Sequence, residues 1–268
     1  MKKIVKALGL SAGASMGERT KKSELLDLIK KLRPMDCGKE LIRIGGDRDG
    51  GYLVPDDLEG IEYCFSPGVS STIDFENHLA ALNIKSFLAD YSVDGPPFDR
   101  AEFTFDKKFL GANNSDKFFT LQFWRDKHLA KYSGDLLLQM DIESSEFQVI
   151  LSTPDTVLND FRIMVIEFHH LDRLFDRFAF RYLLKPCFEK LLTNFCVAHM
   201  HPNNCCGSVR AAGIEIPTVS EFTFYNRKRI AGLKERQDFP HVLDRDNVST
   251  KKSLYLPKIW YSAVKNDR

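Results

Sequence analysis

Acidic and histidine side chains recur where apolar segments of this 268-residue chain end. Asp141 and Glu143 follow the run LLLQM, and Glu167, His169 and His170 close the run RIMVIEFHH. Carboxylates beside imidazoles can move protons near neutral pH, and together they can hold a divalent cation. The pattern therefore predicts a site built from the ends of neighbouring strands.

Two further apolar runs end in polar residues of the same kinds. Asp90 ends FLAD, and the run CVAHMHP carries His199 and His201 and leads to Asn203 and Asn204. Each residue alone has an ordinary explanation, since a lone histidine is commonly a surface residue or a satisfied core residue. Such residues at three successive strand ends are uncommon in a purely structural sheet, and the clustering favours a site.

Two acidic residues of the segment MDIESSE have a structural explanation as well. Asp141 can cap the helix that begins near residues 144–145, because aspartate is a preferred residue at that position. Glu146 is best explained as a first-turn helix residue, which the helix dipole favours.

The elements that must position these residues alternate between strand and helix. After a helix over 21–34 and a hairpin over 40–55, the apolar patterns predict strands and helices in turn. The strands are 61–65, 84–93, 100–111, 135–143, 162–170, 196–202 and 221–228, and the helices are 72–83, 144–152 and 181–195. This alternation predicts an α/β fold with a mostly parallel sheet and helices on both faces. No clear helix separates the last two strands, which predicts an antiparallel edge.

The first strand of the alternating region runs into Ser66-Pro67-Gly68, and a helix follows. This is the layout of a nucleotide-binding strand, loop and helix, with one glycine where the dinucleotide fingerprint has three. Gly68 permits a close backbone approach. Asp90, at the end of the next strand, is well placed to bind the hydroxyls of a ribose, because ligands of open α/β sheets gather at these strand ends.

Several of these segments resemble the FkbM-type methyltransferases, which use S-adenosylmethionine. LLLQMDIESSEFQVIL is similar to the family segment K-I-D-V-E-G-x-E, and MVIEFHHL continues the likeness. YCFSPGVSST resembles the cofactor loop and FLADYSVDGP the acidic second strand, and the likeness covers roughly residues 40–228. It implies a Rossmann-like class I methyltransferase sheet. It also implies methyl transfer to a hydroxyl of a sugar or glycan.

The resemblance implies a role for each candidate residue. Cofactor-binding roles fall on Ser66, Gly68, Ser71, Asp90 and Asp141, catalytic roles on Asp141, His169 and His201, and substrate contacts on Glu143, His170 and Asn203. The chain departs from the family at Ser71 and Ser144, where the family usually has glycine. Ser144 would tighten the turn after Asp141. One glycine suffices in the cofactor loop because S-adenosylmethionine has no pyrophosphate to cradle.

An acceptor hydroxyl needs a base or a cation that lowers its pKa. Asp141, Glu167 and His169 could hold Mg²⁺ or Mn²⁺, and His169 shares a strand face with Glu167. The sequence leaves open whether His169, His170 or His201 is the base. Two other functions also remain open: a metal-dependent hydrolase, and a glycan-binding module without catalysis.

The composition limits the classes of partner and the cellular location that we expect for this chain. Lys and Arg total 38 and Asp and Glu 37, a net charge of +1, which argues against a nucleic-acid binder. No run approaches the 18 apolar residues of a membrane span. The N-terminal MKKIVKALGL faintly resembles a signal peptide, but Lys6 breaks its apolar stretch, and we expect a cytoplasmic protein. The oligomeric state cannot be inferred.

The six cysteines fit no disulfide framework, which agrees with a reducing compartment. Cys64, Cys187 and Cys196 are expected to be buried thiols. Zinc is disfavoured because Cys205-Cys206 has no second pair, and calcium because no glutamate completes the loop that begins DRDGG. We expect three parts: a leader and helix over 1–38, a methyltransferase domain with its hairpin over 39–230, and a C-terminal extension over 231–268.

Overall fold

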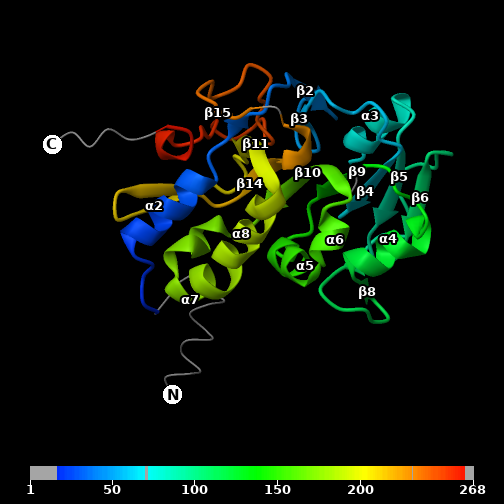
Figure 1. The fold of residues 1–268 in the computed structure, drawn as a ribbon, viewed down its shortest axis with the longest axis horizontal. Helices are drawn as coiled ribbons and strands as arrows, with labels where there is room; N and C mark the ends of the chain where they lie inside the picture. The colour runs from blue at the N-terminus through cyan, green and yellow to red at the C-terminus, as the bar shows by residue number, and fades with distance from the viewer. Residues whose placement is uncertain (1–16, 70–71, 231, 263–268) are drawn as a thin grey trace.

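The computed structural model describes residues 17–69, 72–230 and 232–262. Its centre is a seven-stranded sheet in the order β11-β14-β10-β9-β4-β5-β6 (Figure 1). The strands are β4 (Tyr63–Pro67), β5 (Lys85–Ala89), β6 (Phe103–Asp106), β9 (Leu136–Met140), β10 (Phe161–Phe168), β11 (Phe195–Pro202) and β14 (Ser220–Asn226). β14 pairs antiparallel with both of its neighbours, and the other pairings of this sheet are parallel. The predicted mixed α/β architecture is therefore confirmed.

The order of the strands reverses in the middle of the sheet. The chain starts at β4, moves outward through β5 to β6, and then returns to the other side of β4 to form β9 and β10. At such a reversal the connections leave in opposite directions, which opens a crevice beyond the carboxyl ends of the strands. The crevice of this sheet lies between β4 and β9.

Helices cover one face of the sheet. α4 (Leu121–Leu129), α5 (Glu146–Ser152) and α8 (Lys185–Asn194) pack there, and in Figure 1 they lie together on the same side of the strands. α2 (Lys22–Lys31) joins this layer by burying Leu25, Leu28 and Ile29. α6 (Asp155–Leu158), α7 (Arg177–Ala179) and a π-helical turn (Phe180–Leu184) complete the layer.

The opposite face has a different cover. α3 (Asp74–Ala81) packs over the first strands, while the hairpin of β2 (Leu41–Ile44) and β3 (Tyr52–Pro55) packs over β10, β14 and β11. Thr223 on β14 donates a hydrogen bond to the Leu53 carbonyl oxygen at 2.6 Å, which fixes the hairpin to the sheet. Helices therefore lie on both faces, as predicted, but half of this second face is closed by a hairpin.

One local prediction needs correction, and two features were not predicted. The strand expected over 100–111 divides into β6 and β7 (Phe109–Leu110), and β7 pairs with β8 (Phe118–Phe119). α4 was not predicted, because its sequence has no strong helical pattern of apolar residues; Thr120 caps it by accepting from the Phe123 N–H. A small hairpin of β12 (Ser208–Ala211) and β13 (Ile214–Pro217) lies between β11 and β14.

Segments near both ends of the described chain pack against the body. β1 (Met35–Asp36) pairs with β15 (Lys234–Glu235). Trp260 is fully buried and its indole N–H donates to the Glu215 carbonyl oxygen at 3.0 Å, which ties the C-terminal extension to the rest of the fold. Cys64, Cys187 and Cys196 are buried as predicted. No helix in the described part of the chain is long and apolar enough to cross a membrane.

Candidate active site

A cavity of about 690 Å³ lies at the reversal of strand order. Its lining comes from the segments that follow β4, β5 and β9, from the start of α3, and from the tip of the β2–β3 hairpin. The acidic lining residues are Asp49, Asp74, Glu76, Asp90, Asp141 and Glu143, and the apolar ones include Val69, Val93, Phe109, Leu110 and Phe118. None of the described lining residues is Lys or Arg. The cavity therefore favours a ligand that carries positive charge.

Gly68 lines this cavity where β4 ends. Its φ of +93° is a backbone conformation that residues with a side chain rarely adopt. A Cβ at this position would also overlap the Asp141 carbonyl oxygen. The close approach expected at Gly68 is thus an approach to the chain's own Asp141 backbone. Glycine here lets the loops after β4 and β9 meet at the floor of the cavity.

Asp90 lies at the edge of the cavity where β5 ends, as the sequence predicted. It is 9 % exposed, and its Oδ1 accepts hydrogen bonds from the Ser92 backbone N–H and hydroxyl, both at 2.6 Å. The two bonds fix the orientation of the carboxylate. A fixed carboxylate at the end of the second strand is suited to bind a pair of hydroxyls.

Two residues expected in the cofactor loop differ from Gly68 in their placement. Ser66 is buried, and its hydroxyl contacts Glu76 and donates to Gln139 Oε1 at 2.7 Å, so it supports the cavity floor without lining it. Gln139 in turn donates to the Tyr52 hydroxyl at 3.2 Å. Ser71 lies outside the described residues.

The turn after β9 is strained. Glu143 and Ser144 have φ values of +54° and +86°, which are uncommon for residues other than glycine. The expected tight turn at Ser144 is therefore present. Asp141 does not cap α5: the helix begins at Glu146, its N-cap position is Ser145, and no side chain bonds to the cap.

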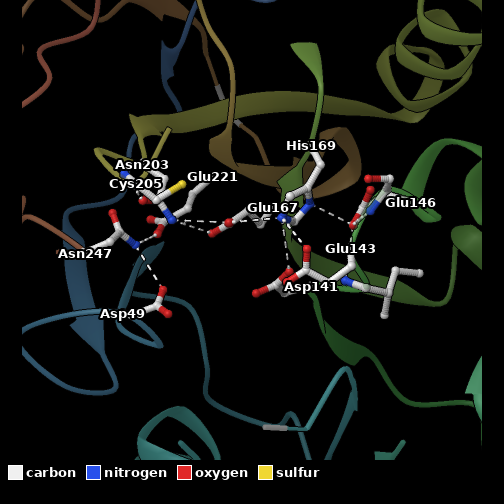
Figure 2. Close-up of polar contacts among 12 residues, drawn as sticks. Asp49, Asp141, Glu143, Glu146, Glu167, His169, Asn203, Cys205, Glu221 and Asn247 are labelled. Atoms are coloured by element: carbon white, nitrogen blue, oxygen red, sulfur yellow. Dashed lines mark hydrogen bonds and ion pairs between the residues drawn. The ribbon is translucent and has the colours of Figure 1, made fainter. Parts of the chain in front are cut away.

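His169 lies among four carboxylates (Figure 2). Its Nδ1 is 3.1 Å from Glu146 Oε1, while its Nε2 is 3.5 to 3.8 Å from the nearest oxygens of Glu143, Glu167 and Asp141. Only the contact with Glu146 has hydrogen-bond length. The imidazole is thus held on one side and faces acidic groups on the other.

Polar residues form a row across neighbouring strands. Glu167 on β10 is paired with Glu221 on β14, and Glu221 is paired with His201 on β11. Asp141 directly follows Met140, the last residue of β9, and Met140 pairs with Ile166, so Asp141 lies next to Glu167 just beyond the end of β9. The sheet register therefore brings together residues that are far apart in the sequence.

Burial changes the ionisation of this row. It raises the pKa of Asp141 to about 7, with nearby carboxylates adding to the effect and His169 opposing it. Burial likewise raises the pKa of Glu221 to about 7, and that of Glu167 well above its ordinary value. For His169, burial lowers the pKa, but the bond to Glu146 and the surrounding carboxylates outweigh burial and raise it. The group is therefore poised to bind or release protons near neutral pH.

Amide side chains close the inner part of the row, as Figure 2 shows. Asn203 donates to both carboxylate oxygens of Glu167, at 3.2 and 3.4 Å. Asn247, from the C-terminal extension, donates to Glu221 at 2.6 Å and to the exposed Asp49 of the hairpin tip at 3.2 Å. Asn203, expected to contact the substrate, is thus bonded to one of the acids of the row.

The other histidines have separate environments. His199 and His201 both face Asp244 of the C-terminal extension, with ring nitrogens 2.8 and 3.6 Å from its Oδ1. His201 lies within the row but makes no ion pair with Asp141 or Glu167 in the described structure. His170 is exposed at the end of β10, with a φ of +56°. Of the three candidate bases, only His169 contacts Asp141, Glu143 and Glu167 in the described structure.

Two overlapping sets of residues have the composition and spacing of a cation site. The ligand atoms of Asp141, Glu167 and His169 lie within 4.8 Å of one another, and so do those of Asp49, Glu167 and Glu221. The first is the set that the sequence predicted as a metal site. Oxygen ligands with one imidazole suit a hard divalent cation such as Mg²⁺ or Mn²⁺.

Sequence reasoning missed Asp49, Asp74 and Glu76 of the cavity lining, and four residues in or beside the polar row. Glu221 begins a strand and gives no sign that it will be buried, while Asn247 and Asp244 lie in a polar tail without periodicity. Glu146 was explained by the helix dipole alone, yet it bonds to His169.

No protein-family model matches the chain, and no curated protein matches it either.

Proposed function

We propose that the protein is an O-methyltransferase that uses S-adenosylmethionine to methylate a hydroxyl of a sugar or glycan. The observation that carries this proposal is the charge of the cavity at the strand reversal, which has six acidic lining residues and, among the described ones, no basic residue. Dinucleotides and nucleoside triphosphates carry phosphates, which this lining would repel. S-adenosylmethionine has no phosphate: it combines a flat base and a ribose with a positively charged sulfonium and amino group and a single carboxylate.

The position of the lining residues supports the same ligand. Phe109 and Phe118, from the strands that follow β5, are in ring contact at 5.5 Å and offer an apolar wall for a base. Asp90 lies on that side, where a ribose would join the base. Asp141 and Glu143 follow β9 on the other side, where a cationic group would lie. A Rossmann-like class I methyltransferase sheet fits the observed strand reversal and the antiparallel β14.

When bound, the cofactor supplies a methyl group already activated by the positive sulfur. The chain's own residues must then orient the acceptor and receive its proton. His169 and Asp141 lie 3.8 Å apart at the boundary between the cavity and the polar row. A hydroxyl beside this pair could give its proton to either of the two atoms, which is the arrangement that general-base catalysis requires.

The same group supports a divalent cation as a second component. Asp141, Glu167 and His169 would hold it, and burial raises the pKa values of Asp141, Glu167 and Glu221, a cost to their charged forms that a bound cation would offset. Such an ion would lower the pKa of an acceptor hydroxyl. Removing metal with EDTA should reduce turnover, and adding Mg²⁺ or Mn²⁺ should restore it. Full activity without metal would leave His169 as the unaided base.

The proposal is tested by incubating the protein with methyl-labelled cofactor and panels of glycans, proteins and nucleic acids. Label should move into glycans and should remain after treatment with alkali, as expected of an ether. Label in nucleic acid alone would contradict the proposed acceptor. Binding of metal without any binding of cofactor would favour a metal-dependent hydrolase, and binding of glycan without transfer would favour a binding module.

A further inference from the structure

Glu146 is a fully buried carboxylate whose hydrogen bonds all converge on one oxygen. Its Oε1 accepts from the backbone N–H groups of Ile142 and Ser144, both at 3.1 Å, and lies 3.1 Å from His169 Nδ1. The two backbone bonds fix the carboxylate against the turn that follows β9. The position of His169 Nδ1 is therefore set by a group that has no freedom to move away.

The other nitrogen of the His169 ring has different surroundings. The carboxylates that face Nε2 belong to Glu143, Glu167 and Asp141, and the shortest of these contacts is 3.5 Å. That distance is too long for an N–H···O hydrogen bond, whereas the contact at Nδ1 is within the normal range. A neutral imidazole carries one proton, and the geometry places it on Nδ1.

We propose that Glu146 is a positioning residue that holds neutral His169 as the tautomer protonated at Nδ1. The Nε2 lone pair is then directed toward Asp141, Glu143 and Glu167. The role of this lone pair rests on the proposed methyl transfer. In that reaction Nε2 would receive the acceptor's proton or bind a cation. The tautomer itself is a property of the free protein and does not depend on that reaction.

A purely structural role for Glu146 explains less of the geometry. Closing the turn needs only an acceptor for two backbone N–H groups, and a neutral amide would serve equally well. A buried carboxylate is costly unless a charged or strongly polar partner offsets it. The imidazole N–H is that partner, and a positive charge that forms on the ring would be offset by the same carboxylate, as in catalytic triads.

Nuclear magnetic resonance of the protein labelled with ¹⁵N-histidine tests the tautomer directly, at an alkaline pH where the ring is neutral. We expect Nδ1 protonated and Nε2 unprotonated in the wild type. Glu146→Gln retains a side-chain oxygen that can accept from the two backbone N–H groups but removes the charge. This variant should give a mixture of His169 tautomers. Glu143→Gln is the matched control, because it removes a carboxylate that faces Nε2 and should leave the tautomer unchanged.

Kinetics give a second readout. Glu146→Gln should lower kcat about tenfold with little change in KM for the cofactor, the effect of losing the partner that orients a functional histidine. In a His169→Gln background the same substitution should cost nothing further. The proposal is overturned if the wild-type ring is protonated at Nε2, or if Glu146→Gln costs as much without His169 as with it. If no methyl transfer is found, the tautomer of His169 in the wild-type protein still tests the proposed role of Glu146.

Discussion

The carboxyl ends of the central sheet form two regions that share acidic residues but differ in what covers them. Beyond β4, β5 and β9 the molecule is hollow, with a cavity of about 690 Å³. Beyond β10 and β14 the space is filled, and Glu167, Glu221, Asn203 and Asn247 are all less than a tenth exposed. The type of side chain does not distinguish these regions. The difference comes from the hairpin and the C-terminal extension, which together close the second region, whereas the hairpin reaches the cavity only with its tip.

The comparison assigns different tasks to the two regions. The hollow region has room for a cofactor, and its acids favour a positive ligand. The filled region bonds its acids to amides and holds them near the boundary, where they can act on a group bound in the cavity. Substitutions in the first should therefore change binding, and substitutions at or beyond the boundary should change turnover or stability.

The largest effect is expected at the boundary. Asp141→Asn should reduce turnover by about a hundredfold or more, because one well-placed electrostatic group contributes on this order. S-adenosylhomocysteine should still bind, since the amide preserves the shape of the cavity wall. Turnover by methyl transfer and binding by calorimetry measure the two effects on the same sample. Equal losses in both would show that Asp141 belongs to the cofactor site alone.

An intermediate effect is expected within the hollow region. Asp90→Ala should weaken binding of S-adenosylhomocysteine by about 1–2 kcal/mol, the scale for losing hydrogen bonds to a charged group. Glu221→Gln, in the filled region, serves as the comparison and should leave this affinity unchanged. Calorimetric titration of both variants sharpens the division between the regions. A larger loss of affinity for Glu221→Gln than for Asp90→Ala would contradict the division between the two regions.

The smallest effect concerns stability in the filled region. Burial raises the pKa of Glu221 from its ordinary value of 4.5 to about 7, so the folded protein binds this proton more tightly than the unfolded chain. The stability this provides is complete below about pH 4.5 and is lost as the pH rises through 7. Glu221→Gln avoids the loss, so its free energy of unfolding should exceed that of the wild type at pH 8. The difference should disappear near pH 4.5 in urea unfolding; a constant difference would contradict it.

The apolar runs predicted the strands of the sheet well because a buried strand must be continuously apolar. Asp141, Glu167 and His169 lie together as expected, since the ends of adjacent parallel strands share one edge. Contacts that depend on distant segments were not predictable. Asn247 reaches Glu221 from a polar tail without periodicity, and Ser66 turns inward to Glu76 and Gln139 because of packing that the loop sequence does not encode.

The central claim is that the acid-lined cavity binds a nucleoside cofactor that carries a cationic group and no phosphate. Calorimetric titration of the purified, folded protein with S-adenosylmethionine, S-adenosylhomocysteine and NAD⁺ tests it most directly. We predict micromolar binding of the first two and no detectable binding of NAD⁺, whose pyrophosphate would face six acidic residues. Binding of NAD⁺ with no binding of the two S-adenosyl compounds would contradict the account.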